Sequence, residues 1–343
     1  ELLAGSTSNS SILRSRLVLS QSADLPPDVR ADWRQIISQL EHIDTIGSAS
    51  VRKTQTALQA LQRADELLRL GSACFQLGQY ERALRHYNKA ADLASVDALV
   101  LVNRAVVNQE LGRLQPALQD LDRVLKAGEN AWAYLYRGVV REQLGEPKRA
   151  LEDYGRAIRL EGGFVEAYYR RGLLYAELGE HDKALQDQNR VLELQPGHPG
   201  AFTARGMARA AMGESQWALQ DLNQGCSLAP TSHLAFYHRG QVRAGLEMYD
   251  EALVDLQQAV ELEPSFAPAF LARGDLNVQT GQLTLAIADY DRAIELQPKN
   301  PAAYYARGLT RAAMRDYRQA VEDYDQALNL DPGHAQALAC RGS

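Results

Sequence analysis

Apolar side chains recur at helical spacing near the start of the chain. Between Asp28 and Ile46 they are separated by steps of four and three residues, a period that predicts an amphipathic helix ending at Gly47. A second stretch, from Val51 to Leu68, has similar spacing and predicts another helix. Because an exposed apolar stripe would promote association, we expect the first helix to pack as an N-terminal cap. A dimerisation helix is the alternative.

Beyond residue 63 the pattern changes to pairs of short amphipathic helices, often joined at a glycine. Neither helix of a pair can bury its apolar stripe alone. The pairs are periodic, because the dipeptide Arg-Gly recurs every 34 residues, at Arg137, Arg171, Arg205, Arg239, Arg273, Arg307 and Arg341. Such a period predicts stacked units that share a continuous core.

These spaced residues resemble the tetratricopeptide repeat. The family pattern has a small residue at position 8, Ala at 20, Leu or Tyr at 24, a small residue or Val at 27 and Pro at 32. Eight units resemble it, starting at Ala64, Ala98, Ala131, Val165, Pro199, His233, Ala267 and Pro301. The resemblance implies an all-α fold, a right-handed superhelical solenoid of stacked helix-turn-helix repeats, here with extra N-terminal helices.

The chain therefore divides into three parts. Residues 1–63 are expected to form a helical extension or cap with a serine-rich start, and residues 64–334 to form eight repeats. Residues 335–343 match the truncated first helix of a ninth repeat. Since the ninth unit stops before a second helix and the chain opens at Glu1 rather than Met, we expect this sequence to be part of a longer protein.

Position 7 departs from the family pattern, in which Leu is usual. Repeats two to eight have Arg there, and the same repeats have Asp at position 23. Repeat one has neither, with Leu70 and His86 at those positions. Because the two residue types appear and disappear together, we expect them to pair between the first and second helices of one unit or of neighbouring units. A charged stripe that binds a ligand is the alternative interpretation.

Composition narrows the classes of partner. The 343 residues include 37 Lys and Arg against 43 Asp and Glu, a net charge of −6, which disfavours a general binder of nucleic acid or anionic membrane. The longest apolar run, Ala131 to Tyr136, is far shorter than the ~20 residues of a membrane span. Cys74, Cys226 and Cys340 form no CxxC pair, which disfavours disulfide and zinc frameworks and predicts a cytoplasmic location.

No catalytic motif stands out in the sequence. GxSxG, HExxH, GxxxxGK and GxGxxG are all missing, so we predict a protein that is not an enzyme and needs no cofactor or metal. His198 and His334 fall at turns between units, where we expect helix capping or solvation. His233 and His238 are five residues apart, a poor spacing for two metal ligands on one helix.

The candidate site is a groove. The family resemblance implies a concave surface lined by positions 2, 5, 6, 9, 12 and 13 of each first helix. In repeats two to four these positions are rich in acidic residues, and from repeat five onward they are small, apolar or aromatic. The residues expected to bind a partner are Tyr136, Glu142, Tyr169, Arg170, Glu177, Met207, Tyr237, His238, Gln241, Leu271, Asp275 and Tyr305.

The resemblance also implies what the groove does not bind. Some members of the family clamp the acidic C-terminal tail of a heat-shock chaperone with Lys at position 5 and Asn at position 9. Here no position 5 is Lys and no position 9 is Asn, although Asn103 and Arg170 occupy position 6. We therefore predict a scaffold or adaptor for a protein or peptide with basic and apolar segments. The alternative is a sensor or regulatory region of a larger enzyme whose catalytic part is absent here.

Overall fold

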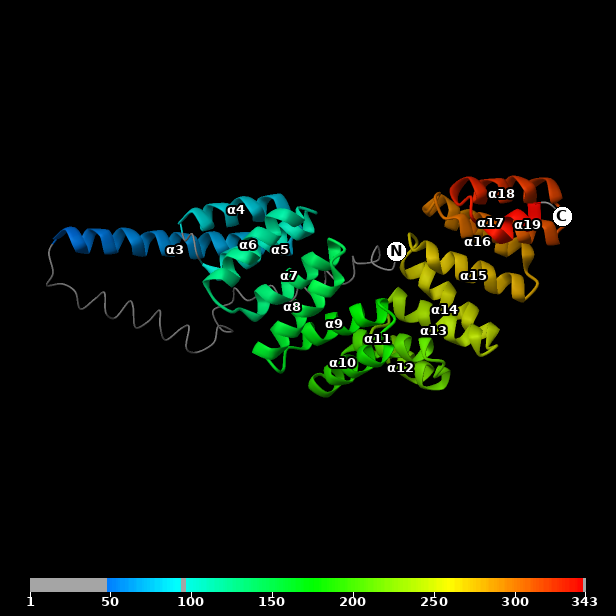
Figure 1. Cartoon of the computed structure of the whole chain (residues 1–343), viewed down its shortest axis with the longest axis horizontal. Coiled ribbons are helices and arrows are strands. Elements are labelled where there is room, and N and C mark those ends of the chain that lie inside the picture. The colour runs from blue at the N-terminus through cyan, green and yellow to red at the C-terminus, as the bar shows by residue number, and fades with distance from the viewer. Residues whose placement is uncertain (1–47, 94–96, 342–343) are drawn as a thin grey trace. The chain divides into compact units, whose positions relative to one another are not determined.

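The computed structural model describes residues 48–93 and 97–341, and in these residues all the regular structure is helical (Figure 1). The helices are α3 (Ser48–Gln76), α4 (Tyr80–Leu93), α5 (Ala98–Glu110), α6 (Leu114–Ala127), α7 (Ala131–Gln143), α8 (Pro147–Leu160), α9 (Val165–Glu177), α10 (His181–Leu194), α11 (Pro199–Ala211), α12 (Ser215–Leu228), α13 (His233–Gly245), α14 (Tyr249–Leu262), α15 (Ala267–Gln279), α16 (Leu283–Leu296), α17 (Pro301–Ala313), α18 (Tyr317–Leu330) and α19 (Ala335–Arg341). No helix in this described part combines the length and apolar character of a membrane span.

The N-terminal extension is only partly described. The helix predicted between Asp28 and Ile46, with its proposed capping contacts, lies outside the described residues. The helix predicted from Val51 is continuous with the first helix of repeat one, since both belong to α3. The boundary placed after residue 63 is therefore not a break in the backbone. At the other end, α19 (Ala335–Arg341) lies where the first helix of a ninth unit is predicted.

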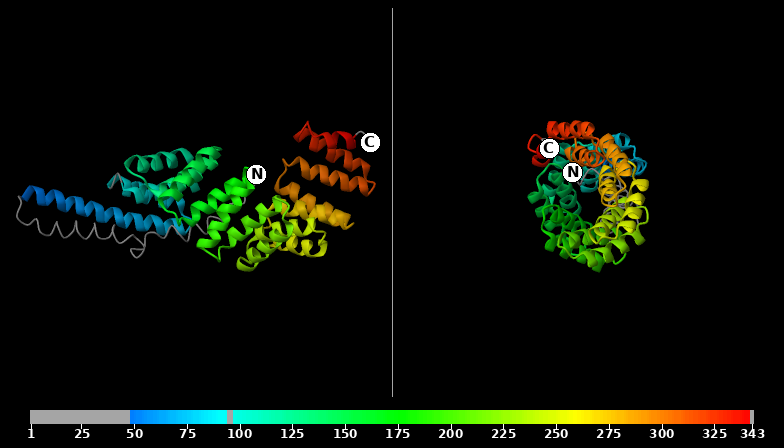
Figure 2. Two further views of the ribbon diagram at one scale, coloured as in Figure 1. Left: turned by 60° about the horizontal axis from the view of Figure 1, so that its bottom comes forward. Right: turned by 90° about the vertical axis from the view of Figure 1, so that its right-hand side faces the viewer.

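Odd-numbered helices are the first helices of the repeats and even-numbered helices are the second. By their internal contacts the helices form two compact units, one that extends to Ala167 and one that begins at Tyr168. Within each unit every second helix packs against the first helix of the next repeat, as α6 does on α7 and α12 on α13 (Figure 2). The helical hairpins therefore stack as the repeat period predicts.

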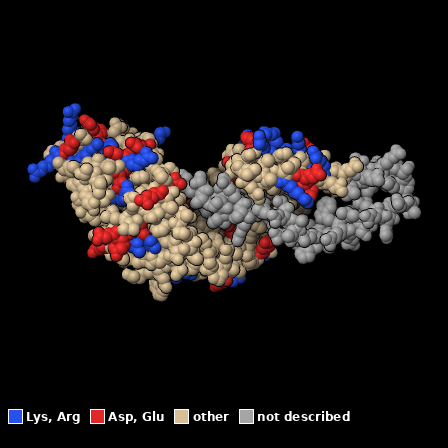
Figure 3. All heavy atoms as spheres, turned by 180° about the vertical axis from the view of Figure 1, so that it is seen from behind, with Lys and Arg blue, Asp and Glu red and all other residues tan. Residues whose placement is uncertain are grey.

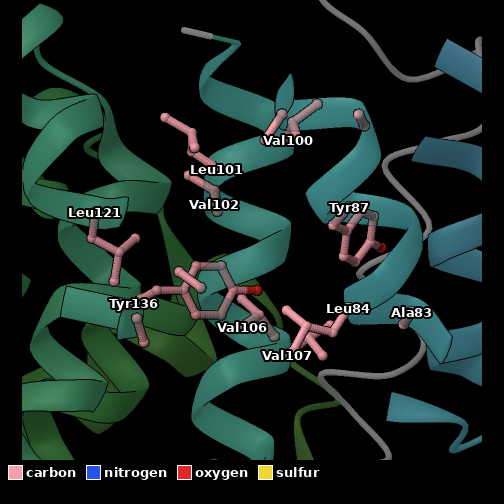
Figure 4. Close-up of a cluster of buried hydrophobic side chains, with 14 of the residues drawn as sticks. Ala83, Leu84, Tyr87, Val100, Leu101, Val102, Val106, Val107, Leu121 and Tyr136 are labelled. Atoms are coloured by element: carbon pink, nitrogen blue, oxygen red, sulfur yellow. The ribbon is translucent and has the colours of Figure 1, made fainter. Parts of the chain in front are cut away.

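The helix pairs pack closely where position 8 is small. A Cβ atom added to Gly138 would lie 2.6 Å from the Tyr154 ring, and one added to Gly274 would lie 2.6 Å from the Tyr290 ring. Both tyrosines are at position 24 of the second helix and are almost completely buried. In repeat two position 8 is Ala105 and position 24 is Leu121, and both residues are buried; Figure 4 shows Leu121. The small residue is thus required by the helix crossing.

The turn inside most repeats needs a left-handed backbone conformation. Gly78, Gly112, Gly145, Gly179, Gly213 and Gly281 have φ between 70° and 80°. Glu247 and Arg315 occupy the same place in repeats six and eight, with φ of 61° and 65°. Side chains with a Cβ are disfavoured in this region, so these two turns are strained relative to the glycine turns.

First helices form the inner side of each unit. In one unit α3 contacts α5 and α5 contacts α7; in the other, α11, α13, α15 and α17 contact one another in succession. Second helices of successive repeats make no comparable contact in the described part of the chain. Because first helices are closer together than second helices, each stack curves with its first helices on the concave side.

Candidate functional site

The arginines of position 7 bind the aspartates of position 23 in the same repeat. In repeat six, Nε and Nη2 of Arg239 donate to the two carboxylate oxygens of Asp255, at 2.9 and 2.6 Å. The Asp255 side chain is 1% exposed and that of Arg239 is 16% exposed. The same ion pair occurs in all seven repeats that have both residues: Arg104–Asp120, Arg137–Asp153, Arg171–Asp187, Arg205–Asp221, Arg239–Asp255, Arg273–Asp289 and Arg307–Asp323.

A second donor, at position 11 of the first helix, completes several of these pairs. Nη1 of Arg243 donates to Asp255 at 2.7 Å, and Nδ2 of Asn277 donates to Asp289 at 2.9 Å. Arg141, Arg209 and Arg311 make the equivalent bond in their own repeats. Each of these buried carboxylates therefore accepts at least three charge-assisted or amide hydrogen bonds. The Arg or Asn at position 11 is visible in the sequence, but the predicted pair of position 7 with position 23 did not include it.

The arginine of position 7 also reaches the previous repeat. Nη1 of Arg239 donates to Asn223 at 3.1 Å, and Nη1 of Arg205 donates to Asn189 at 2.7 Å. Asn223 and Asn189 are both at position 25, which is Asn, Asp or Gln in every repeat except repeat three, where Gly155 has no side chain. The arginine thus joins the two helices of one repeat and also ties that repeat to its neighbour.

An aromatic ring at position 4 packs under the same arginine in repeats three to eight. The guanidinium carbon of Arg239 lies 5.2 Å from the centroid of the Phe236 ring, and that of Arg307 lies 5.6 Å from the Tyr304 ring. The arginine of position 7 thus contacts a carboxylate, a polar side chain of the previous repeat and an aromatic ring, all within the stack. We call the series of position 7 arginines and position 23 aspartates the Arg and Asp ladder, and its role is structural. The structural pairing expected from the sequence is thus confirmed.

The histidines at the turns cap helices. Nδ1 of His198 accepts a hydrogen bond from the backbone N–H of Ala201 at 3.0 Å, and Nδ1 of His334 accepts one from Ala337 at 3.2 Å. An accepting Nδ1 requires the neutral imidazole with its proton on Nε2. The expectation that these residues cap their helices is confirmed.

Helix geometry indicates which positions of the first helices face inward. Position 8 points at the second helix. At 100° per residue, positions 2, 6, 9 and 13 lie about 100 to 160° around the helix from it. Position 5 lies about 60° away, on the side of the next repeat. Position 12, which is Glu142 in repeat three, lies only about 40° from position 8. The other predicted partner-binding positions therefore lie on the inner side or at its junction with the next repeat.

The predicted residues differ in exposure. Glu142, Arg170, Met207, Tyr237, His238, Leu271 and Tyr305 are half-buried, and Glu177, Gln241 and Asp275 are exposed. Tyr136 and Tyr169 are buried. The seven half-buried and three exposed residues have surface on which a partner could be bound, whereas the two buried tyrosines do not.

Tyr136 and Tyr169 therefore need correction as binding residues. Tyr136 is 6% exposed and belongs to the core of its unit, where it lies beside Val106 (Figure 4). Tyr169 is 8% exposed, and its ring centroid lies 4.9 Å from that of His198. Both rings are covered by neighbouring helices or turns, which sequence position alone does not reveal.

Rings at position 5 contact the last residue of the same repeat. Tyr237 and Phe266 meet edge to face with centroids 5.1 Å apart, and Tyr305 lies 4.8 Å from His334. The Tyr237 hydroxyl accepts a hydrogen bond from Nε2 of Gln241 at 2.9 Å. These two tyrosines are fixed by packing while part of each remains accessible.

His238 is neutral at physiological pH. Its ring makes a 3.1 Å hydrogen bond to Oε1 of Gln241, and its centroid lies 4.9 Å from the Tyr237 ring. Burial lowers the pKa of His238 to about 4 and also lowers the pKa of His233, the other histidine of α13. This part of the inner side is therefore aromatic and polar but carries no positive charge on its histidines.

Two carboxylates of first helices accept hydrogen bonds from buried tyrosines of position 24. The Tyr154 hydroxyl donates to Glu142 at 2.8 Å, and the Tyr290 hydroxyl donates to Asp275 at 2.8 Å. The expected acidic half is smaller than its sequence suggests, since Glu166 is 5% exposed. On the face shown in Figure 3, acidic and basic side chains are intermixed over the described surface.

Family models match most of the repeat region. Models described as TPR repeat or tetratricopeptide repeat match residues 71–112, 102–161, 135–199, 234–266, 274–314 and 301–334. The chain belongs to the tetratricopeptide repeat family. Proteins of this family generally mediate protein–protein interactions and are typically non-enzymatic scaffolds.

Individual relatives of this tetratricopeptide repeat chain are distant. A Hsp70-Hsp90 organizing protein of Triticum aestivum is 34% identical over 58 residues, which is 17% of this chain and 10% of the relative's length. The match thus spans only a tenth of that protein.

Solved structures share the fold. The Cut9-Hcn1 hetero-tetramer of APC/C matches with a TM-score of 0.65 and 18% identity, over 85% of this chain and 58% of that chain. A tetratricopeptide repeat protein of Parabacteroides merdae matches with a TM-score of 0.58 and 21% identity, over 73% of this chain and 99% of that chain. At these identities the likeness is one of fold alone.

Proposed function

We propose that this chain is a protein interaction scaffold that binds an extended or helical segment of a partner on the inner side of its first helices. The observation that carries the proposal is a series of half-buried apolar and aromatic side chains on successive first helices of repeats five to eight. They are Met207, Tyr237, Leu271 and Tyr305. Side chains that are rigid and partly accessible are typical anchors of a peptide groove.

The partner segment is proposed to be basic and apolar. The first helices of one unit offer the carboxylate of Glu142, and those of the other unit offer Glu177 and Asp275. His238, in the second of these units, is neutral. An acidic tail would be repelled by such a surface. Although one relative is a Hsp70-Hsp90 organizing protein, the lysine and asparagine expected of a chaperone-tail clamp are missing from positions 5 and 9. We therefore do not extend that protein's role to this chain.

The proposed location is the cytoplasm. Support comes from the cysteines: Cys74, Cys226 and Cys340 are free thiols, as is usual in a reducing compartment. Fractionation of cells that express the intact protein would test this location.

Two tyrosines of repeat eight provide the test of groove binding. Tyr305 is half-buried on first helix α17, whereas Tyr317 is 64% exposed on second helix α18. After a partner is identified by cross-linking to the intact protein, its affinity is measured for Tyr305→Ala and for Tyr317→Ala. We expect Tyr305→Ala to weaken binding by about 2 kcal/mol or more, as anchors do, and Tyr317→Ala to have little effect.

The opposite result would refute the proposal. If Tyr317→Ala abolishes binding while Tyr305→Ala leaves it intact, the partner binds the second helices. Thermal unfolding followed by circular dichroism establishes that each variant is folded before its affinity is compared.

A further inference from the structure

Asp275 differs from the other aspartates that the stack constrains. The seven aspartates of position 23 each bind an arginine, whereas no cation pairs with Asp275 among the residues that the structure describes. Its polar contact is the Tyr290 hydroxyl, which donates to one carboxylate oxygen at 2.8 Å. Tyr290 is 1% exposed. A carboxylate held by a neutral phenol is fixed in place but keeps its full negative charge.

The carboxylate is exposed yet surrounded by protein groups that do not neutralise it. Asp275 is at position 9 of α15, and α15 contacts α13, which carries Tyr237 and His238. Burial is the main cause of the raised pKa of Tyr237, and the negative charge of Asp275 is near enough to add to it. Although Asp275 remains exposed, partial desolvation of its carboxylate raises the pKa of Asp275, despite the opposing bond from Tyr290. A cation bound at Asp275 would therefore compensate the partial desolvation of its carboxylate, which no cation among the described residues now offsets.

The neighbouring side chains suit an organic cation. Leu271 is one helical turn before Asp275 and is half-buried, so it offers apolar surface to an aliphatic stem. Tyr237 is held by Gln241 and Phe266, and aromatic rings attract cations. His238 is neutral and does not repel one. A divalent metal ion would need six or more oxygen ligands, which one carboxylate and one phenol do not supply.

We propose that Asp275 is the docking point for an arginine or lysine side chain of the partner segment, beside Tyr237 and Leu271. This inference rests on the proposed groove function and specifies its chemistry. The cation would form a charge-assisted hydrogen bond with the carboxylate oxygen, while its stem would lie against apolar surface. The partner segment would then have a basic residue flanked by apolar residues.

The experiment selects binders from a phage-displayed library of random dodecapeptides on the whole chain. The same selection is made on Asp275→Asn, which keeps an acceptor for Tyr290 but removes the charge. Asp250→Asn is the matched control, because Asp250 is exposed in the first turn of second helix α14. We expect a basic residue at one position of most peptides selected on the wild type and on Asp250→Asn, and no such preference on Asp275→Asn.

A thermodynamic cycle with one selected peptide gives the direct measure. Replacing its basic residue by citrulline, which is neutral and of similar shape to arginine, should weaken binding to the wild type at least tenfold. The same replacement should change binding to Asp275→Asn less than twofold, since the charge partner is already lost. An equal loss on both proteins would overturn the inference, as would a basic-residue preference that persists on Asp275→Asn.

The experiments distinguish failure of the cation site at Asp275 from failure of the proposed groove function. Binding that is lost in Tyr305→Ala but unchanged in Asp275→Asn would refute the cation site and retain the groove. Binding that is unaffected by either variant, or selection that yields no binder at all, would refute the groove function and this inference with it.

Discussion

Arg239 donates hydrogen bonds to both carboxylate oxygens of Asp255, which lies 16 residues later on the second helix of the same repeat. The pair is largely buried, and Arg239 also reaches Asn223 in the repeat before. One side chain therefore supports both the helical hairpin and its junction with the previous one. The same arrangement recurs along the stack. We therefore expect the replacement of one such arginine to lower the stability of the chain rather than to weaken the binding of a ligand.

Arg239→Ala should destabilise the chain by about 3 kcal/mol, because it leaves the buried Asp255 carboxylate without its main partner. Arg292→Ala is the control: its pair with Glu295 is exposed and should be worth about 0.5 kcal/mol or less. Urea unfolding gives both values. A double-mutant cycle should show coupling of Arg239 with Asp255 and none with Asp221, which binds Arg205. Absence of coupling with Asp255 would contradict the structural role of the ladder.

Gly138→Ala should cost roughly 1 to 3 kcal/mol, because the new methyl group overlaps the Tyr154 ring and forces the helices of repeat three apart. Gly245→Ala is the matched control, since a Cβ there meets open space at the end of α13. It should be neutral or stabilise by up to about 1 kcal/mol through helix propensity. Equal unfolding free energies for the two variants would show that position 8 does not set the helix spacing.

Glu247→Gly should stabilise the chain by about 0.5 to 1 kcal/mol, because glycine adopts the left-handed turn without the steric cost of a Cβ. Arg315→Gly should behave alike, as its φ is 65°. Gly213→Ala makes the reverse change at a turn with φ of 80° and should lower stability by about 1 kcal/mol. Differential scanning calorimetry measures all three, and a loss of stability in Glu247→Gly would contradict the strain assigned to that turn.

Stability should fall with pH through the protonation of His238. Its pKa is about 4 in the fold against an ordinary value of 6.5, so the unfolded chain takes up the proton first. The contribution of neutral His238 to the free energy of unfolding is therefore complete above about pH 6.5. It is lost as the pH falls from about 6.5 to about 4. The urea midpoint should drop more steeply over this window for the wild type than for His238→Gln. Identical pH profiles would show that His238 is not kept neutral by the fold.

The spacing of arginine and aspartate in the repeats predicts part of the Arg and Asp ladder. The joint occurrence of Arg at position 7 and Asp at position 23 predicted a pair, and the pair is present. Whether it lies within a repeat or between repeats depended on how the helices cross, which the pattern does not contain. The link from Arg205 to Asn189 had a sequence signal at position 25, but it has meaning only once adjacent repeats are placed side by side.

The candidate site shows the same division. By sequence position, four tyrosines are predicted to line the groove: Tyr136, Tyr169, Tyr237 and Tyr305. Only the latter two keep accessible surface, since the first two are covered by core side chains or by His198. The tie between Tyr290 and Asp275 was equally hidden, because the two residues lie on different helices and form no recurring pair.

The amino-acid sequence by itself determined the helices, their 34-residue period, the small residues at the helix crossings and most of the turn glycines. These features follow from backbone geometry and from side chains a few residues apart, so they can be read locally. The tertiary structure decided which carboxylates are neutralised and which aromatic rings remain accessible. Exposure and charge compensation depend on atoms from the neighbouring helix and the next repeat, whose distances are set only when the stack forms.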